Sequence, residues 1–404
     1  MIKSIDASRR LAVVLSHPTQ YYSPWFRWIR AQTDLELRVF YLWDFGVAEK
    51  RDPRFGATFK WDVDLLSGYE FEFVRNTAAR PGTERFLGLN NPSLTERLAA
   101  WAPTDVLLFG YRSVSHIRAI VWASRRGIPI HFRGDSHLLG RGSLRLHVRL
   151  ALRALYARFA TFLFVGKANR DYFKALGVPD RKLFFAPHSV DITLFQRDSP
   201  SHHEASQKLR LQLGISPSTR VVLFAGKLVA DKQPLELLAA FLALGLRDTV
   251  LVFVGDGPQK ERLQEFASRN AGGSDSPSAR FLPFANQSEM PSRYLLADLF
   301  VLPSRGVYET WGLAVNEAMH MGVPCLVSDR VGCQRDLVTP GETGWVFDPT
   351  DPQALGQTLS LALSDLGSMS RKSAIRHAAD LRIAGYTYTQ TTAGLLAALA
   401  ATRA

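Results

Sequence analysis

The stretch that decides the fold is Leu299-Phe300-Val301-Leu302-Pro303-Ser304, followed shortly by Tyr308-Glu309-Thr310-Trp311-Gly312-Leu313-Ala314-Val315-Asn316-Glu317. Its first part is an apolar run typical of a buried strand, and its second part predicts a loop and then a helix that ends at Gly322-Val323-Pro324. Glu309 is thus expected on the loop past the strand, and Glu317 about one turn into the helix. Open α/β sheets bind ligands at that edge, and a helix N-terminus favours phosphate. Two acids beside an anion site suit the hydroxyl groups of a ribose and a hexose, so the stretch predicts a sugar-nucleotide site.

The same alternation of apolar runs and helical patterns covers the rest of the chain, as expected for parallel βαβ units. At 404 residues the chain is too long for one ordinary core, and its polar segment Arg197–Glu204 predicts a linker. We therefore predict an α/β fold of two Rossmann-like doubly wound domains facing across a cleft, over residues 1–198 and 207–385. A helical pattern at residues 386–404 is expected to pack on the second domain or to cross back to the first. The expected strands are Leu11–Ser16, Leu35–Tyr41, Val106–Phe109, Ile128–Phe132, Phe162–Val165, Leu183–Ala186, Val221–Ala225, Val250–Val254, Arg280–Leu282, Leu299–Leu302, Pro324–Ser328 and Gly344–Phe347.

The overall charge points to an anionic partner. The chain has 49 basic and 37 acidic residues, a formal net charge of +12, although a basic bias of the source proteome is an alternative explanation. Phosphorylated small molecules and acidic lipid headgroups fit better than nucleic acid, because the sequence carries no nucleic-acid recognition motif. No apolar run approaches the ~18 residues that cross a bilayer, and Leu11–Leu15 is too short for a signal-peptide core. We therefore expect a cytoplasmic protein.

Two further absences exclude classes of site. The two cysteines, Cys325 and Cys333, cannot form a disulfide framework, and no Cys/His cluster has zinc spacing. The G-x-G-x-x-G spacing of a dinucleotide site is missing, which argues against a nicotinamide oxidoreductase.

The turn Gly226-Lys227 … Lys232 follows a strand, and Pro234 is well placed in the first turn of the next helix. Gly226 allows a sharp turn beside a ligand, so Lys227 and Lys232 can both reach a diphosphate. Two solvated surface lysines are the plainer alternative.

Taken together, the motifs of the second half resemble family-4 retaining glycosyltransferases. The segments follow in the order of that family and cover most of residues 220–350. The resemblance implies a GT-B architecture, a UDP-, GDP- or ADP-sugar as donor, and no need for a metal or another cofactor. The segments that carry it are Gly226–Lys232, Gly255–Pro258, Ala297–Ser304, Glu309–Glu317, Gly322–Pro324 and Gly341–Val346.

The resemblance also implies roles for individual residues. Lys227 and Lys232 would bind the diphosphate, with Lys227 in the place of a more common arginine, so that a point charge replaces a bidentate fork. Glu317 would accept hydrogen bonds from the ribose, and Glu309 would lie near the transferred sugar. The backbone N–H groups of the helix start, Gly312, Leu313 and Ala314, would hold phosphate.

Two departures from the family pattern bear on specificity. Thr310 and Trp311 stand where Gly-Phe is more common, which leaves the identity of the donor sugar open. Base recognition in this family often uses backbone groups, here expected around Phe284–Gln287.

The first half is expected to bind the acceptor, through polar and aromatic loops after its strands. His17, Gln20 and Tyr21 lie in the first such loop, which also resembles that of polysaccharide-assembly members of the family. The aromatic residues of this loop, including Tyr22 and Trp25, can alternatively cap the core.

A second polar turn in the first half, Arg133-Gly134-Asp135-Ser136-His137, supplies further candidates, and His131 is expected in the core. Many relatives carry a histidine where Asp135 falls, so Asp135 is the candidate to orient the acceptor hydroxyl or take its proton. Arg133 and His137 are predicted to bind the acceptor beside it.

Residues 140–159 predict a basic amphipathic helix, with Arg145, Arg149 and Arg153 on one face. Such a helix can lie on an anionic membrane, which would make the protein peripheral at the inner face of the membrane. A helix packed on the sheet with a solvated arginine face is the alternative.

We expect a retaining hexosyltransferase that acts on a glycan, lipid-linked or small-molecule acceptor in polysaccharide or glycoconjugate biosynthesis. Asp135, Glu309 and Lys232 are the candidate catalytic residues. A sugar-nucleotide epimerase of similar architecture and a non-enzymatic sugar-nucleotide sensor stay open. A hydrolase with paired carboxylates is the weaker reading, because both acids lie on one strand–loop–helix element beside phosphate ligands.

Overall fold

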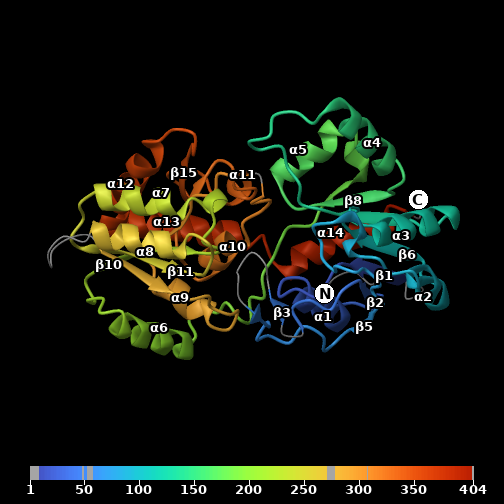
Figure 1. Ribbon diagram of the computed structural model, residues 1–404, viewed down its shortest axis with the longest axis horizontal. Coiled ribbons are helices and arrows are strands. Elements are labelled where there is room, and N and C mark those ends of the chain that lie inside the picture. The colour runs from blue at the N-terminus through green and yellow to red at the C-terminus, as the bar shows by residue number, and fades with distance from the viewer. Residues whose placement is uncertain (1–8, 48–49, 52–57, 271–277, 307, 403–404) are drawn as a thin grey trace.

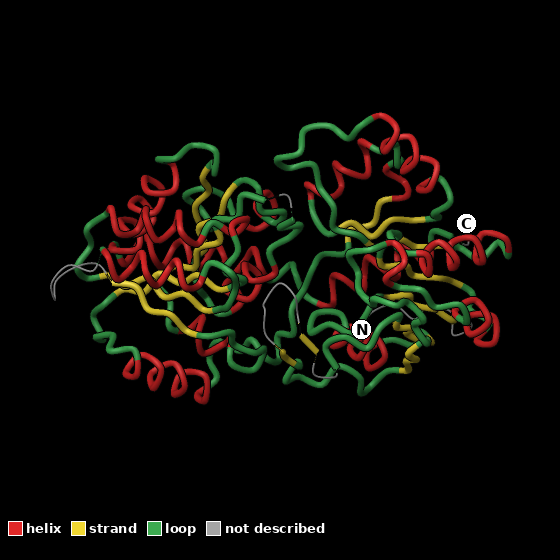
Figure 2. The backbone as a smooth tube through the Cα atoms, viewed as in Figure 1, coloured by secondary structure: helices red, strands yellow, loops and turns green. Residues whose placement is uncertain are grey.

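The computed structural model describes residues 9–47, 50–51, 58–270, 278–306 and 308–402. Two parallel sheets, each covered by helices on both faces, form two domains that lie side by side (Figures 1 and 2). The N-terminal sheet has the order β5-β2-β1-β6-β7-β8-β9, and the C-terminal sheet the order β12-β11-β10-β13-β14-β15. In each sheet the first strand lies at the middle and the order reverses beside it, which is the doubly wound Rossmann arrangement. The predicted α/β, GT-B fold class is therefore confirmed.

The central strands of the N-terminal sheet consist mostly of buried residues. β1 pairs in parallel with both β2 and β6, which places Val13 between Val39 and Leu107. Such near-continuous apolar strands are expected when helices cover both faces of a parallel sheet. The elements are β1 (Arg10–Leu15), α1 (Ser23–Gln32), β2 (Glu36–Tyr41), β3 (Lys50–Arg51), β4 (Thr58–Phe59), β5 (Glu70–Phe73), the 3₁₀ turn η1 (Phe86–Gly88), α2 (Leu94–Trp101), β6 (Asp105–Phe109), α3 (Val114–Arg125), β7 (Ile130–Arg133), α4 (Leu146–Tyr156), β8 (Thr161–Phe164), α5 (Lys167–Ala175), η2 (Asp180–Lys182) and β9 (Leu183–Phe185).

The C-terminal domain repeats the pattern with a second apolar sheet. β10 pairs in parallel with β11 and β13, so that Leu223 lies between Val252 and Phe300. The elements are α6 (Pro200–Gln212), β10 (Arg220–Ala225), η3 (Ala230–Lys232), α7 (Pro234–Ala243), β11 (Thr249–Val254), α8 (Lys260–Arg269), β12 (Ser278–Leu282), α9 (Met290–Leu295), β13 (Leu299–Leu302), α10 (Leu313–His320), β14 (Cys325–Ser328), α11 (Gln334–Leu337), β15 (Gly344–Phe347), α12 (Ala354–Gly367) and α13 (Met369–Ile383). The last helix of the chain, α14 (Tyr388–Ala400), follows them.

All twelve predicted strands are present, with boundaries shifted by at most two residues. The short edge strand β5 was not predicted. The linker prediction at Arg197–Glu204 was wrong in part, because helix α6 begins within it at Pro200. Proline suits the first turn of a helix, where its missing N–H costs no hydrogen bond.

The last helix, α14, returns to the N-terminal domain. Figure 1 shows it in red among the blue and green elements of that domain. Leu395 and Leu399 are fully buried in the same apolar cluster as Leu11 and Val13 of β1. The Trp25 indole N–H also donates to the Thr392 hydroxyl at 2.9 Å. The chain therefore crosses between the domains twice, and of the two placements left open for residues 386–404 the structure has the crossing one.

Across the described part of the chain, no helix is both long enough and apolar enough to cross a membrane.

Candidate functional site

A cleft of about 560 Å³ lies between the domains, where loops from the carboxyl ends of both sheets meet. The strand ends supply these loops because each β-strand runs toward the cleft before its chain turns into a helix. Its lining includes twelve of the predicted site residues: His17, Gln20, Tyr21 and Asp135 from the N-terminal domain, and Gly226, Lys227, Lys232, Glu309, Gly312, Leu313, Ala314 and Glu317 from the C-terminal domain. The fold thus gathers into one space residues that are up to 300 positions apart in sequence.

Two glycine turns form the floor of the donor side. Gly226 follows β10 with φ +154°, and Gly255 follows β11 with φ +145°. A Cβ on Gly255 would lie 2.0 Å from the Gly226 carbonyl oxygen, so only glycine allows the two backbones to pack this closely. The approach brings the turns at the ends of neighbouring strands together beside Lys232, whose side-chain Nζ would lie 3.5 Å from a Cβ on Gly226.

Lys232 and Glu309 form an ion pair at the centre of this side. The Lys232 Nζ lies 2.5 Å from Glu309 Oε2, and the Ser304 hydroxyl donates to the same oxygen at 3.0 Å. The two charged side chains are only 23% and 16% exposed, so water screens the pair incompletely. A diphosphate that arrives at Lys232 would compete with Glu309 for the ammonium group and leave the carboxylate available to a hydroxyl.

Glu317 has a different environment, made of neutral donors. Its Oε1 accepts from the Tyr21 hydroxyl at 3.1 Å and from the Gln287 amide at 3.0 Å, and its Oε2 accepts from the Tyr294 hydroxyl at 2.7 Å. Burial raises the pKa of the Glu317 carboxyl, and the three hydrogen bonds oppose that rise. A buried carboxylate served only by hydroxyl and amide donors is suited to exchange one of them for a ligand hydroxyl.

The helix that carries Glu317 starts at the cleft. Gly312 is its N-cap residue, with φ +95°, and provides no side-chain hydrogen bond to the first turn. The first residues of α10, Leu313 and Ala314, line the cleft next to it. A helix start of this kind presents backbone N–H groups and the positive end of the helix dipole.

On the opposite wall, Asp135 links the two domains. Its Oδ2 accepts from the Thr310 hydroxyl of the C-terminal domain at 2.8 Å, and lies 3.8 Å from His188 Nε2. Its side chain is 41% exposed toward the cleft. Partial burial would raise the pKa of Asp135, but the His188 imidazole and the Thr310 hydroxyl outweigh it and hold the pKa below its usual value. Asp135 is therefore ionised at neutral pH.

Two predicted acceptor ligands are placed elsewhere, and the prediction for them needs correction. Arg133 is 2% exposed, and its guanidinium donates to the carbonyls of Ala186 and Pro187 at 2.7 and 3.2 Å. His137 is also 2% exposed. Its Nδ1 accepts from the Leu139 N–H at 3.1 Å, so its Nε2 carries the proton and donates to the Glu309 carbonyl at 3.3 Å. Both side chains are occupied in holding the backbone of the cleft.

Tyr21 also differs from its predicted role. It lines the cleft, but its hydroxyl reaches across to Glu317 on the donor side. Sequence alone could not show this, because 296 residues separate the two partners. His131, in contrast, is fully buried between Thr161 and Asp105, which confirms its predicted place in the core.

Several cleft residues were missed at the sequence level. Trp61, His188 and Tyr294 all line the cavity. His188 follows β9 at the carboxyl edge of the sheet, so the rule that selected the other polar turns would have found it. Trp61 and Tyr294 lie on segments without a recognisable motif, and the sequence carries no signal for them.

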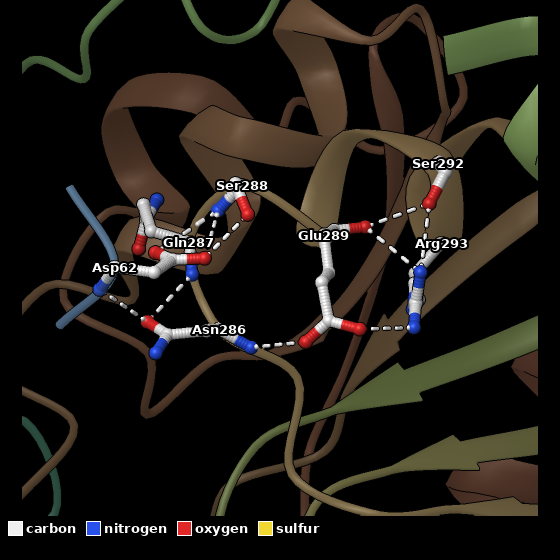
Figure 3. A network of polar contacts seen from close by, with 7 residues as sticks. All are labelled: Asp62, Asn286, Gln287, Ser288, Glu289, Ser292 and Arg293. Atoms are coloured by element: carbon white, nitrogen blue, oxygen red, sulfur yellow. Dashed lines mark hydrogen bonds and ion pairs between the residues drawn. The ribbon is translucent and has the colours of Figure 1, made fainter. Parts of the chain in front are cut away.

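A segment of the N-terminal domain, residues 60–62, binds the loop that leads into α9 (Figure 3), and we call this segment the strap. The Asp62 carboxylate accepts from the Ser288 hydroxyl and backbone N–H, and the Asp62 N–H donates to Asn286 Oδ1 at 3.3 Å. The Asn286 side chain in turn donates to the Lys60 carbonyl at 2.7 Å. Trp61, between them in sequence, lines the cleft near Phe284, with ring centroids 6.4 Å apart. The strap therefore covers the segment where base recognition was predicted.

A second seam joins the domains behind the cleft. Both carboxylate oxygens of Asp336 accept from the backbone N–H of Lys167, the first residue of α5, at 3.1 and 3.0 Å. An acid of one domain thus caps a helix of the other. Burial raises the pKa of Asp336 to about 6, against the effect of the Lys167 N–H. Gly166 leaves room for Trp311 here, since a Cβ on Gly166 would lie 2.5 Å from the indole.

Comparison with known proteins adds a family to this geometry. Residues 205–380 match the family described as "Glycosyl transferases group 1". A similar relative is the "GDP-mannose-dependent alpha-(1-6)-phosphatidylinositol monomannoside mannosyltransferase" of Mycolicibacterium smegmatis, 32% identical over 224 residues, which are 54% of this chain and 56% of that protein. The chain spans about half the length of the curated relatives it matches.

Solved structures resemble the whole chain. A glycosyltransferase from Rickettsia africae is 12% identical with a TM-score of 0.74, covering 98% of this chain and 99% of that one. Anabaena HepE, solved in complex with UDP-glucose, is 19% identical with a TM-score of 0.70, covering 98% of this chain and 100% of that one. Identities this low show the fold alone. Residues 205–380 therefore match the glycosyl transferases group 1 family, and the chain as a whole has the two-domain GT-B fold.

Proposed function

We propose that this protein is a retaining glycosyltransferase that moves a hexose from a nucleotide-diphosphate sugar to an acceptor hydroxyl. One observation carries the proposal. Lys232, Glu309 and Glu317 converge in a single interdomain cleft, at the ends of two parallel sheets, although their motifs are separated by up to 85 residues. A cation for the diphosphate and acids for two sets of hydroxyls are the groups that binding a sugar nucleotide requires.

In this proposal the C-terminal domain binds the donor. Lys232 and Lys227 neutralise the diphosphate as it leaves, and the N–H groups at the start of α10 hold its oxygens. Glu317 accepts from the ribose, in exchange for one of its present donors, and Glu309 accepts from the transferred sugar once Lys232 turns to phosphate. Because these groups supply the positive charge, we expect the enzyme to need no divalent cation, and activity in EDTA equal to that in magnesium would support this.

The N-terminal domain binds the acceptor, whose hydroxyl is oriented by Asp135. His17 and Gln20 line the same wall and offer further polar contacts. The acceptor hydroxyl attacks from the face that the diphosphate leaves, and the leaving phosphate takes its proton. The configuration at the anomeric carbon is then retained, which NMR of the product in a transfer assay tests directly.

The names of two similar proteins suggest candidate donors. The mycolicibacterial relative is named for GDP-mannose, and HepE was solved with UDP-glucose. GDP-mannose and UDP-glucose are therefore the first donors to test, followed by ADP-glucose. A glycan or lipid-linked acceptor is proposed on the same grounds.

We also propose that the protein works at the inner face of a membrane, through helix α4. Leu146 and Leu150 are 69% and 56% exposed on this helix, and Arg145 and Arg149 are exposed beside them. An apolar and basic face of this kind suits an anionic bilayer. The double variant Leu146→Glu/Leu150→Glu should lose co-sedimentation with vesicles containing phosphatidylglycerol. The matched control Leu211→Glu, a 78% exposed leucine of α6, should keep it.

A donor panel tests the function. Thermal shift with UDP-, GDP- and ADP-sugars identifies the donor, and release of free nucleoside diphosphate is then measured with and without acceptor. Acceptor-dependent release supports a transferase. Interconversion of the donor sugar without acceptor would indicate an epimerase, and binding without any turnover would indicate a sensor.

A further inference from the structure

The loop after β9 places His188 at the base of the cleft, and three elements hold its backbone there. Arg133 of β7 donates to the two preceding carbonyls, those of Ala186 and Pro187. The Thr391 hydroxyl of α14 donates to the Pro187 carbonyl at 2.8 Å. The Asn316 amide of α10 donates to the carbonyl of His188 itself at 3.2 Å. Residues of both domains therefore fix the position of this loop.

The imidazole ring of His188 is buried against aromatic side chains. His188 is 4% exposed, and its ring lies between Tyr22 and Trp311, with centroid separations of 6.1 and 5.6 Å. Burial lowers the pKa of His188, so the ring is neutral at physiological pH and carries one proton.

Despite this support, the Nε2 atom of His188 is buried without a hydrogen-bond partner among the residues that the structure describes. Buried polar atoms are usually satisfied, and leaving one unpaired is costly. The nearest acid is Asp135, whose Oδ2 lies 3.8 Å away, beyond hydrogen-bond distance. Both residues line the cleft beside Thr310 and Glu309. His188 and Asp135 are therefore held close together at the cleft, and the Nε2 atom of His188 has no hydrogen-bond partner in the described part of the chain.

We propose that His188 Nε2 and the Asp135 carboxylate together bind one hydroxyl group of a pyranose ring. A hydroxyl oxygen can lie ~2.8 Å from both atoms at once, since their separation is 3.8 Å. It then donates its proton to the ionised Asp135 and accepts from the Nε2–H of His188. The O–H and a lone pair of the hydroxyl are then both satisfied, whereas a carboxylate ligand could only accept. Arg133 becomes a positioning residue, because it holds the loop rather than the sugar.

This inference rests on the proposed transferase function, and it leaves two sources for the hydroxyl. It belongs either to the sugar of the donor, held near Glu309, or to the acceptor. The chemistry of recognition is the same in both cases. The two sources differ in which binding step loses affinity when the imidazole is removed.

The test compares two substitutions of different chemistry. His188→Phe keeps the ring and removes Nε2, whereas His188→Gln keeps a donor that reaches to about the same point. His320→Phe is the matched control, since His320 also has a buried Nε2 without a partner in the described chain but lies at the far end of α10. The probes are GDP-mannose and UDP-glucose, together with free GDP and UDP, measured by calorimetry. Thermal melts check that each variant is folded.

If the hydroxyl is on the donor sugar, His188→Phe weakens the affinity for the nucleotide sugar about 10- to 100-fold. The affinity for free GDP or UDP then stays within about twofold of the wild-type value. If it is on the acceptor, donor affinity and slow donor hydrolysis by water are unchanged, and kcat/KM for the acceptor falls by the same factor. In either case His188→Gln recovers part of the loss, and His320→Phe shows none of it.

Equal loss of affinity for free GDP or UDP and for their sugars would overturn the inference, because His188 would then act only on the shape of the cleft. Wild-type affinity and transfer in His188→Phe would overturn it as well. Failure of the transferase proposal looks different, because the wild-type chain itself then shows no acceptor-dependent release of nucleoside diphosphate.

Discussion

The two walls of the cleft are built on the same fold but with opposite chemistry. The C-terminal wall presents formal charges to the cavity, where the partly buried Lys232 and Glu309 are paired at 2.5 Å. The N-terminal wall places its cation, Arg133, 2% exposed beneath the surface and presents aromatic rings, amides and Asp135 instead. One wall therefore offers formal charge to a ligand, and the other offers shape and neutral hydrogen bonds around one acid.

Because of this difference, we expect the two walls to contribute differently to catalysis and to sugar binding. A diphosphate needs charge neutralisation, which grows as the bond to the sugar breaks, so the C-terminal wall should affect catalysis most. A sugar hydroxyl needs directed hydrogen bonds, each of which contributes less. Substitutions on the charged wall should accordingly have the larger effects, and the following experiments test that order.

Removal of Lys232 should have the largest effect. Lys232→Ala takes away the cation of the diphosphate site and leaves Glu309 unpaired in a partly buried place, so we expect kcat/KM for the donor to fall by ~10²–10³-fold. Donor-dependent release of nucleoside diphosphate measures this. Lys208→Ala is the control, because Lys208 forms an exposed pair with Glu204 outside the cleft. Near-normal transfer by Lys232→Ala would remove the distinction between the walls.

Glu317→Ala should follow, with donor affinity weakened by ~10²-fold, because its carboxylate is the proposed ligand of the ribose. Calorimetric titration with the nucleotide sugar provides the measurement. Glu236→Ala, which removes an exposed helix acid on α7, serves as the control for a solvated role. If both variants bind donor equally well, Glu317 has only a structural part.

At the seam behind the cleft, where Asp336 contacts Lys167, the free energy of unfolding should depend on pH. Burial raises the pKa of Asp336 to about 6, above its value in the unfolded chain. The stability that the protonated carboxyl contributes is therefore fully present below the pKa of the unfolded chain and is lost as pH rises through 6. We expect the stability difference between wild type and Asp336→Asn to change by about 2 kcal/mol between pH 4 and pH 7. Melting temperatures of both proteins across this range provide the check.

The matched control for this experiment is Asp171→Asn, which removes an exposed carboxylate from the same seam, where it pairs with Arg335. Its melting temperature should follow the wild type at every pH. A pH-independent difference for Asp336→Asn would show that its carboxylate is not the titrating group.

Loss of the hydrogen bond between Tyr21 and Glu317, which joins the two walls, should have a smaller effect on donor binding than loss of Glu317 itself. Tyr21→Phe removes one of three donors to Glu317, which corresponds to about 1 kcal/mol, or a roughly fivefold change in donor affinity. A double-mutant cycle with Glu317→Gln measures the coupling. Tyr69→Phe, which alters a buried hydroxyl of the N-terminal core, should leave donor affinity unchanged. Additive effects of Tyr21→Phe and Glu317→Gln would mean that the observed hydrogen bond contributes nothing.

The smallest effect is expected at the strap. Asp62→Ala removes an exposed contact to Ser288, so the KM for the donor should change only two- to threefold, with kcat preserved. Steady-state kinetics measure both constants. A large fall in kcat would show that the contact between Asp62 and Ser288 contributes to catalysis as well as to donor binding.

The sequence was most informative about the strands and the donor wall. The buried strands are continuous apolar runs, and the donor motifs are short segments whose residues act close to their place in the chain. The strand β5 was missed because its sequence, Glu70-Phe71-Glu72-Phe73, forms a short and largely exposed edge. Helix α6 was missed at its start because Ser199 and Pro200, which are helix-start residues, lie in a polar run typical of a loop.

The acceptor wall could not be predicted as well, for a geometric reason. In a dense polar turn the sequence does not show which side chains point into a cleft and which point into the protein. Arg133, Asp135 and His137 alternate along one such turn, and only Asp135 lines the cavity, as the buried contacts of the other two show. The bond between Tyr21 and Glu317 depends on how the domains meet, which short-range patterns do not record.

The return of α14 to the first domain has a consequence for how the protein is made. The apolar face formed by Leu11, Val13 and Leu163 is completed by Leu395 and Leu399. About 200 residues separate β9 from α14, so at usual rates of translation the ribosome needs roughly 10–40 s to supply this cover. During that time the first domain exposes part of its core. The nascent chain should therefore bind chaperones through its N-terminal half until its last helix is released.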